Sequence, residues 1–580
     1  MNDFMLGNEA IARGAYEAGV RLVSSYPGTP STEITEYCAK YPEIYAEWAA
    51  NEKVALEVCA GASMAGARSI CCMKHVGLNV ASDPLYTLAY TGVNGGLVVV
   101  VADDPGMHSS QNEQDSRMHA RGSQVPMLEP SDSDECRAFT KLAFELSEKY
   151  DTPVFVRTTT RVAHARSVVH PQERVEAALK PYQKDISKWV MMPGMAKGRH
   201  VVVEKRMNDL AKDASALPVN RVEMGDTKIG VICSGMAYQY VKEVAPEISV
   251  LKLGIVNPLP MDLIADFARQ VETLYVFEEL EPVIEEQVAA HGIPVTGKAL
   301  TGRQGELSAH KVAKLLGKEI PTAAQPDPVP ARPPVLCPGC PHRGVYAVLN
   351  KLKCTVTGDI GCYTLGALPP LSALDSTLCM GASIGMSQGY NRMLGDSAAE
   401  KTVAVLGDST FLHSGATSLI SACYNRARVT VMILDNSTTG MTGHQPNPST
   451  GFDIHGERTT QISLTQLCEA CGVPKEHIRV CDPFDMKALE AAIKEENAFD
   501  GVSVIVARRP CMLLDKKSRK SPLSIKADAC RNCLSCMKLG CPAIERMEKG
   551  VRINPDLCVG CGHCQNVCPF GAIVEGSEAK

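Results

Sequence analysis

The chain has 580 residues, a hydrophobic fraction of 45% and a formal net charge of −6, so it is too long for one hydrophobic core and we expect roughly three to five domains. The slightly acidic balance argues against the basic surface of a nucleic-acid-binding protein. No apolar run approaches a membrane span and the N-terminus does not resemble a signal peptide, so we expect a cytoplasmic protein that contacts neither nucleic acid nor membrane.

The first segment, residues 1–166, alternates apolar strands with helical patterns. Its predicted strands are residues 21–26, 96–102 and 154–156. Between them residues 52–68, rich in Ala and Gly, are predicted to form a helix. Strands separated by helices indicate a parallel α/β sheet. Residues 167–225 are charged and lack clear periodicity, so we expect an irregular connector there.

A second α/β unit is predicted over residues 226–319. Its strands are expected at residues 229–234, 248–253 and 273–277, with helices at 237–244 and 261–270. Residues 320–335 contain six prolines and no apolar periodicity, which is typical of a stiff, extended linker. A third α/β unit is predicted over residues 336–512.

The last segment, residues 521–580, carries eight of the 24 cysteines in two similar runs. In each run, three cysteines spaced two residues apart precede a Cys-Pro pair, whose cysteine ligates the other cluster in two-cluster ferredoxins. We therefore predict two [4Fe-4S] clusters in a ferredoxin-like domain. The first is assigned to Cys530, Cys533, Cys536 and Cys568, and the second to Cys558, Cys561, Cys564 and Cys541. Structural zinc is the alternative, but zinc sites are usually paired C-x-x-C knuckles.

Two predicted strands of the third unit end in oxygen-bearing side chains. Residues 402–406 lead into Gly407-Asp408, and residues 429–434 lead into Asp435-Asn436-Ser437-Thr438. Open α/β sheets bind ligands at the carboxyl ends of their strands. A carboxylate, an amide oxygen and a backbone carbonyl suit Mg²⁺. The alternative is that both segments only mark turns between a strand and a helix.

The spacing of Gly407-Asp408 and Asn436 resembles the diphosphate-binding motif of thiamine-dependent enzymes. This resemblance implies thiamine diphosphate as a cofactor bound around Gly407. It also implies Mg²⁺ held by Asp408, Asn436 and the carbonyl of Thr438.

Near the N-terminus, Tyr26-Pro27-Gly28-Thr29-Pro30-Ser31 and the helix opening at Asn51-Glu52 resemble the 2-oxoacid:ferredoxin oxidoreductase family. The resemblance implies that Glu52 acts on the aminopyrimidine of the cofactor, with Glu57 as the competing residue. It implies that Thr29 contacts the 2-oxoacid. The substrate carboxylate needs a cation, and Arg121 lies at the position that the family suggests. Two neighbours remain open as alternatives to it, Arg117 and His119.

A third group of cysteines surrounds the predicted thiamine segment. It comprises Cys337 and Cys340 in a C-x-x-C pair, Cys362 after Gly361, and Cys511 after Pro510. This order resembles simpler members of the family and implies a third [4Fe-4S] cluster near the cofactor. Cys379 is the competing fourth ligand. The alternatives are ordinary buried cysteines, or zinc bound by Cys337, Cys340 and His342.

The domain order and residues 440–446 most resemble the alpha subunits of family members that act on arylpyruvates. The implied fold is several doubly wound parallel-sheet α/β domains plus a small C-terminal α+β ferredoxin-like domain. The domains are pyrimidine-binding (1–166), transketolase-C-terminal-like (226–319), diphosphate-binding (336–512) and ferredoxin-like (521–580).

The implied reaction is oxidative decarboxylation of an arylpyruvate, indolepyruvate in particular. It uses coenzyme A and yields aryl-acetyl-CoA, CO2 and reduced ferredoxin. The implied partner is a separate, smaller beta subunit in a heterodimer of dimers. The rival functions are oxidation of another 2-oxoacid, a non-oxidative thiamine decarboxylase and a pure electron-transfer subunit.

Overall fold

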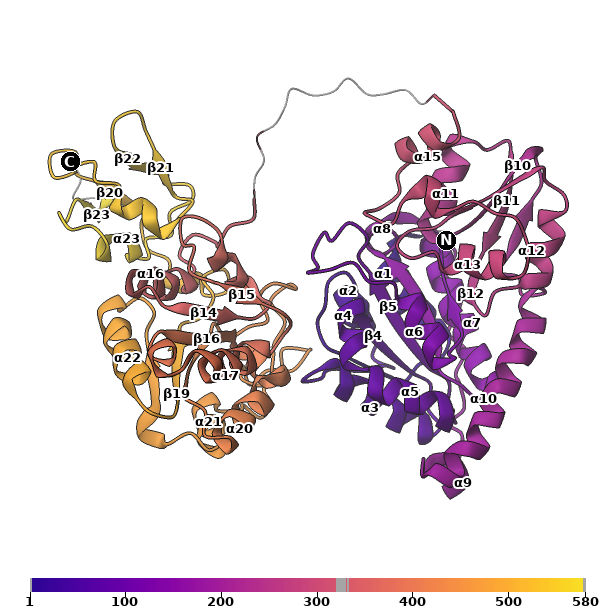
Figure 1. Cartoon of the computed structure of the whole chain (residues 1–580), viewed down its shortest axis with the longest axis horizontal. Helices are drawn as coiled ribbons and strands as arrows, with labels where there is room; N and C mark the ends of the chain where they lie inside the picture. The colour runs from indigo at the N-terminus through magenta and orange to yellow at the C-terminus, as the bar shows by residue number, and fades with distance from the viewer. Residues whose placement is uncertain (1–2, 320–329, 331–332, 577–580) are drawn as a thin grey trace. The chain divides into compact units, whose positions relative to one another are not determined.

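A computed structural model describes residues 3–319, 330 and 333–576. The chain divides into two compact units, Met1–Pro326 and Asp327–Lys580, which are described separately (Figure 1). Most of the predicted proline-rich linker, residues 320–335, lies outside the described residues.

The N-terminal unit contains a seven-stranded sheet of order β12-β6-β7-β5-β4-β2-β3. Its strands are β2 (Leu22–Ser25), β3 (Tyr45–Trp48), β4 (Ser69–Lys74), β5 (Leu97–Asp103), β6 (Met127–Leu128), β7 (Val154–Thr159) and β12 (Ile255–Asn257). Neighbouring strands are parallel except β12 and β6. Every residue of β5 is buried, which explains the continuous apolar run in its sequence. Helices α3 (Glu52–Met64) and α5 (Ser82–Thr91) share a core cluster with β5.

A four-stranded sheet of order β13-β10-β11-β9 completes this unit. Its strands are β9 (Arg221–Glu223), β10 (Asp226–Ser234), β11 (Ile248–Leu253) and β13 (Thr273–Phe277). Helices α11 (Gly235–Val244) and α15 (Ala309–Leu315) belong to one of its core clusters. Helices α12 (Met261–Ala268) and α13 (Val283–Ala290) belong to another, which also includes residues of the seven-stranded sheet. The two sheets therefore share part of one core.

The expected irregularity of residues 167–225 is wrong, whereas their role as a connector stays a prediction. This segment contains α9 (Ile186–Trp189) and the 22-residue helix α10 (Pro193–Ala214). Only four residues of α10 are buried, among them Arg206. Its guanidinium donates hydrogen bonds to the backbone carbonyls of Asp151, at 2.8 Å, and Ala89. A helix held partly by a buried arginine has a weak apolar periodicity, so the hydrophobic pattern did not reveal it.

The C-terminal unit is built on a six-stranded parallel sheet of order β15-β14-β16-β17-β19-β18. Its strands are β14 (Thr355–Gly358), β15 (Ser376–Thr377), β16 (Thr402–Gly407), β17 (Val429–Asp435), β18 (Ile478–Cys481) and β19 (Val502–Arg508). Alternate strand residues face two separate cores: Val403 and Val405 pack with α16 (His342–Leu352) and α22 (Met486–Ala498). Ala404 and Leu406 pack with α17 (Ala382–Leu394), α20 (Ala416–Tyr424) and α21 (Leu464–Ala470) (Figure 1). The sheet is thus doubly wound.

Two short antiparallel strand pairs form the cysteine-rich end of this unit, together with helix α23 (His563–Asn566). The pairs are β20 (Leu523–Ile525) with β23 (Ile573–Glu575), and β21 (Ile544–Arg546) with β22 (Val551–Ile553). Together with the parallel sheets, this small α+β segment confirms the predicted fold class. No helix in the described part of the chain is long and apolar enough to span a membrane.

Candidate active site and cysteine clusters

Four neighbouring parallel strands of the N-terminal sheet end at one edge. These strands, in the order β3-β2-β4-β5, carry at or just after their carboxyl ends Glu52, Thr29, Lys74 and Asp104. Parallel strands direct all their carboxyl ends to the same edge, so residues distant in sequence meet there. This edge gathers two of the predicted site residues, Glu52 and Thr29.

Glu52 is the first residue of α3 and is buried. The side chain of Asn51 caps the helix by accepting a hydrogen bond from the backbone N–H of Val54 at 2.9 Å. The Glu52 carboxylate lies against Gly77, where an added Cβ would come within 2.6 Å of Oε1. Glu57 instead is 45% exposed and pairs with Lys53 on the helix surface. The structure therefore favours Glu52 over Glu57 for chemistry inside the protein.

Thr29 lies in a turn after β2. The hydroxyl of Ser31 closes this turn by donating a hydrogen bond to the carbonyl of Gly28 at 2.8 Å. The side chain of Lys74 lies beside this turn, with Cγ 3.5 Å from the position of a Cβ added at Gly28. Burial lowers the pKa of Lys74 to about 8, against the opposing charges of Asp104 and Glu52. Sequence reasoning missed Lys74; its signal was a lysine ending the apolar strand Ser69–Lys74.

The predicted substrate arginine, Arg121, is exposed in the last turn of α6 (Ser116–Ser123). Its guanidinium makes no hydrogen bond or ion pair with any residue that the structure describes. The alternative Arg117 is buried and its donors are in use: it pairs with Asp115 and Glu278 at 2.6 Å each. Burial lowers the pKa of the other alternative, His119. Arg117 thus has a structural role.

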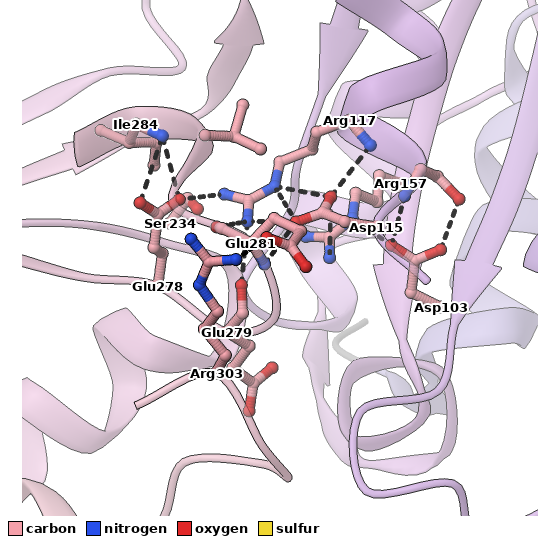
Figure 2. Close-up of polar contacts among 12 residues, drawn as sticks. Asp103, Asp115, Arg117, Arg157, Ser234, Glu278, Glu279, Glu281, Ile284 and Arg303 are labelled. Atoms are coloured by element: carbon pink, nitrogen blue, oxygen red, sulfur yellow. Dashed lines mark hydrogen bonds and ion pairs between the residues drawn. The ribbon is translucent and has the colours of Figure 1, made fainter. Parts of the chain in front are cut away.

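Arg117 belongs to a buried charge network that joins the two sheets of the N-terminal unit (Figure 2). Its partner Glu278 follows β13, whereas Arg117 itself lies in α6. Arg157, in β7, pairs with Asp103 at 2.7 Å and with Glu129. Every carboxylate named here thus pairs with an arginine of the chain, and each arginine pairs with at least two carboxylates.

The C-terminal sheet repeats the arrangement of strand ends. Strands β14, β16, β17 and β19 are neighbours and parallel. Just after their carboxyl ends lie Cys362, Asp408, Asn436 and Cys511, in that order. The fold therefore explains how residues far apart in the sequence reach one edge.

The three predicted Mg²⁺ ligands lie together at this edge. The side-chain oxygen of Asn436 is 3.3 Å from Asp408 Oδ1 and 2.8 Å from the carbonyl oxygen of Thr438. Turned over, the amide would donate a hydrogen bond to each. As it stands, three oxygens face one another near the edge length of an octahedron with metal–oxygen bonds of about 2.1 Å, which is about 3.0 Å. These residues fit the ion that the resemblance implies.

The surroundings of Asp408 contain further polar groups. Its Oδ2 accepts hydrogen bonds from Asn447 at 3.2 Å and Ser449 at 3.4 Å, two residues that sequence reasoning missed. Burial, together with Asp435, raises the pKa of Asp408 to about 7. A bound cation would favour the ionised carboxylate. Gly407 packs against Tyr363, where an added Cβ would come within 2.7 Å of the ring.

The third cysteine group converges beside this oxygen site. Burial raises the pKa of Cys362 to about 11, with contributions from the thiols of Cys511 and Cys337. Burial likewise raises the pKa of Cys340 to about 12, with contributions from Cys362 and Cys337. The backbone N–H of Cys511 donates to the carbonyl of Asn436 at 2.9 Å. These interactions link the four cysteines to one region beside Asn436, where among the described residues no three thiols come close enough to hold a single metal ion.

The competing ligands of this group differ in their exposure. Cys379 is exposed. Partial desolvation of its thiol, together with the charge of Asp359, raises its pKa. His342 is buried with its ring edge-on to Tyr363, the centroids 6.1 Å apart. These positions favour Cys362 over Cys379 as the companion of Cys337, Cys340 and Cys511.

The eight C-terminal cysteines line two hollows. One is lined by Cys530, Cys533, Cys536 and Cys568, and the other by Cys541, Cys558, Cys561 and Cys564. Both sets match the predicted grouping, in which each run supplies its fourth cysteine to the other. Among the described residues, no three His, Cys, Asp or Glu side chains meet closely enough for a single metal ion. Cluster binding by these particular residues stays a prediction.

Three family models match the chain. They are "Pyruvate flavodoxin/ferredoxin oxidoreductase, thiamine diP-bdg" over residues 13–216, "Thiamine pyrophosphate enzyme, C-terminal TPP binding domain" over residues 359–507, and "4Fe-4S binding domain" over residues 551–574. The first match includes α10. Thiamine diphosphate and [4Fe-4S] binding are thus supported independently of the motifs.

Curated relatives match almost the whole chain. The subunit IorA of indolepyruvate oxidoreductase from Pyrococcus horikoshii is 40% identical over 99% of this chain and 97% of the relative. The IorA subunits of Thermococcus kodakarensis and Methanothermobacter thermautotrophicus are each 41% identical, over 99% and 98% of this chain and 97% of each relative. With both thiamine-binding models and the iron–sulfur model matched in one chain, this protein belongs to the IorA family, within the thiamine-diphosphate-dependent 2-oxoacid:ferredoxin oxidoreductases.

Proposed function

We propose that this chain is the catalytic subunit of an arylpyruvate:ferredoxin oxidoreductase, with indolepyruvate as its foremost substrate. The reaction converts an arylpyruvate and coenzyme A to aryl-acetyl-CoA and CO2 and passes two electrons to ferredoxin. One observation carries the proposal: the same chain presents a buried Glu52, the Asp408–Asn436–Thr438 oxygens and grouped cysteines. The names of its relatives support the substrate.

Each strand edge has its own task in this proposal. When bound, thiamine diphosphate supplies the electron sink for decarboxylation. Asp408, Asn436 and the carbonyl of Thr438 would hold Mg²⁺. Glu52, buried at the start of α3, would act on the aminopyrimidine of the bound cofactor. Thr29 contacts the 2-oxoacid.

The cysteines supply the electron path. Cys337, Cys340, Cys362 and Cys511 would hold a cluster beside the oxygen site. The two C-terminal sets would hold two more. We infer that a smaller beta subunit completes the enzyme, because the relatives are each named as a subunit. Ferredoxin is the proposed acceptor.

The test is an anaerobic assay of the chain co-produced with its partner subunit. Ferredoxin reduction is measured with coenzyme A and a panel of indolepyruvate, phenylpyruvate, pyruvate and a branched 2-oxoacid. The expected result is the highest kcat/KM for the two aryl substrates. Preference for pyruvate or the branched acid would overturn the substrate, and aldehyde release without ferredoxin reduction would overturn the oxidative reaction.

A further inference from the structure

The substrate of the proposed reaction carries a carboxylate, so the site needs a cation. The arginines near the predicted position do not offer one inside the protein. Arg117 is held by Asp115 and Glu278 in the buried network, and Arg121 is exposed. A buried cation near Thr29 and Glu52 is therefore the stronger candidate.

Lys74 lies on β4, the neighbour of the strand that leads to Thr29. It ends β4, with its side chain beside the Gly28–Thr29 turn. Its Nζ donates a hydrogen bond to the carbonyl of Ser109 at 2.9 Å. The hydroxyl of Ser109 in turn donates to the carbonyl of Thr29 at 3.4 Å. One residue therefore contacts both the ammonium and the turn that carries Thr29.

The ammonium of Lys74 has hydrogen-bonding capacity to spare. An ammonium has three donors, and within the described residues only the bond to Ser109 uses one of them. Lys74 is only 9% exposed. Burying a cation away from water is costly unless an anion or several acceptors compensate it. A ligand with an anionic oxygen would supply that compensation.

The charges of Asp104 and Glu52 favour the ammonium of Lys74 without forming an ion pair with it. Asp104 accepts hydrogen bonds from Ser109 N at 2.8 Å, Ser110 Oγ at 2.7 Å and Thr160 Oγ1 at 2.6 Å. These donors satisfy Asp104 locally, and among the described residues no carboxylate comes within ion-pair distance of Lys74. Its charge thus remains available at the strand edge.

We propose that Lys74 binds the carboxylate of the 2-oxoacid and thereby selects anionic 2-oxo substrates. The inference rests on the proposed function and assigns the carboxylate to Lys74 in place of Arg121. No bond is made or broken at Lys74. Its role is to place the carboxylate that departs as CO2 beside Thr29 and on the same edge as Glu52.

The test compares Lys74→Met and Lys74→Arg in the enzyme co-produced with its partner subunit. Met keeps the length of the side chain and removes the charge. Its KM for the arylpyruvate should rise about 10- to 100-fold, because a hydrogen bond to a charged group is lost, while kcat changes less. Lys74→Arg should lie between Met and wild type. Lys40→Met, which removes an exposed lysine of the same unit, is the matched control.

A second measurement separates recognition of the carboxylate from distortion of the site. The probe is an arylpyruvamide, the uncharged amide of the substrate, used as a competitive inhibitor. In Lys74→Met its inhibition constant should stay within about twofold of wild type while KM for the acid rises. Bound thiamine diphosphate and thermal unfolding should match wild type.

The outcomes are distinguishable. An unchanged KM in Lys74→Met, or equal weakening of acid and amide, would overturn the role of Lys74 and leave the proposed function standing. If the wild-type enzyme fails to reduce ferredoxin with every 2-oxoacid of the panel, the proposed function is overturned, and this inference with it.

Discussion

The two sheet edges that carry the predicted site balance their charges in different ways. Behind the edge of the seven-stranded sheet, the buried carboxylates Asp103, Asp115 and Glu278 are paired with Arg117 and Arg157. At the edge of the six-stranded sheet, Asp408 is buried beside Asp435, and among the described residues it forms no ion pair. Each of the first carboxylates has an arginine partner, whereas at the second edge Asp435 pairs with Arg508 at 2.6 Å and Asp408 is left without one. A buried anion without a cationic partner is costly, so the second edge indicates an external cation.

This difference separates structural charges from functional ones. Arg117 is near the predicted substrate position in sequence, but its donors are satisfied internally. Lys74 and Asp408 are buried with capacity to spare. Charge type alone therefore does not identify a ligand-binding residue; the partners of the charge do.

The largest expected effect tests proton chemistry at the first edge. Glu52→Gln should lower kcat about 100- to 10,000-fold, the range for removing a general acid–base group, while bound thiamine diphosphate stays at wild-type content. Glu57→Gln, on the exposed face of the same helix, is the matched control and should keep wild-type activity. The measurements are ferredoxin reduction and thiamine content. Full activity in Glu52→Gln would remove Glu52 from the mechanism.

The next prediction tests whether arginines of the chain stabilise the buried carboxylates behind the first edge. Arg117→Met leaves Asp115 and Glu278 buried without their partner, so the N-terminal unit should lose about 3–5 kcal/mol of stability. Arg303→Met removes an ion pair with Glu281 in which the arginine side chain is 59% exposed. This substitution should lower the stability by at most about 1 kcal/mol. Denaturant unfolding with hydrogen exchange in β7 and α6 measures both. Equal small losses would show that the network is not a stabilising element.

The same network has a pH signature. Burial opposes ionisation of Asp115, but Arg117 and Arg157 outweigh it and lower the pKa to about 2. The ordinary value is about 3.9, so the contribution of Asp115 to stability is present above about pH 4 and is lost as the pH falls toward 2. Arg117→Met should weaken this acid dependence. An identical acid profile in the variant would contradict the assigned cause.

A smaller effect tests the need for an external cation at the second edge. Asp408→Ala should weaken binding of Mg²⁺ and thiamine diphosphate together, by about 100-fold or more, since even groups outside the metal shell are worth about 10- to 100-fold. Asp396→Ala, at a carboxylate that is 88% exposed, should bind both normally. Titration calorimetry measures the affinities. Loss of Mg²⁺ with undiminished cofactor binding would contradict the assigned role of the ion as a bridge.

The smallest expected change concerns iron. Three clusters would give about twelve irons per chain, and Cys362→Ala should lose about four of them. Cys379→Ala, at an exposed cysteine of the same domain, should keep all. Iron analysis of anaerobically purified protein distinguishes them. About eight irons in wild type, unchanged in Cys362→Ala, would eliminate the third cluster.

Local patterns determined much of this protein. The strand ends at Asp408 and Asn436 and the crossed grouping of the C-terminal cysteines depend on spacing along a short stretch of chain. So does the parallel class of the sheets, which follows from strands alternating with helices. Structure and sequence agree on these features because neighbouring residues specify them.

Tertiary structure alone decided which charges are free to act. The pairing of Arg117 with Glu278 spans 161 residues, and no local pattern predicts it. The burial of Glu52, the exposure of Glu57 and the placement of Lys74 beside Thr29 likewise depend on how parallel strands are ordered in the sheet. Helix α10 was missed because it buries only four of its 22 residues, one of them an arginine, so its apolar stripe is sparse. The energy of a buried charge depends on its partners, and partners are brought together only by the fold.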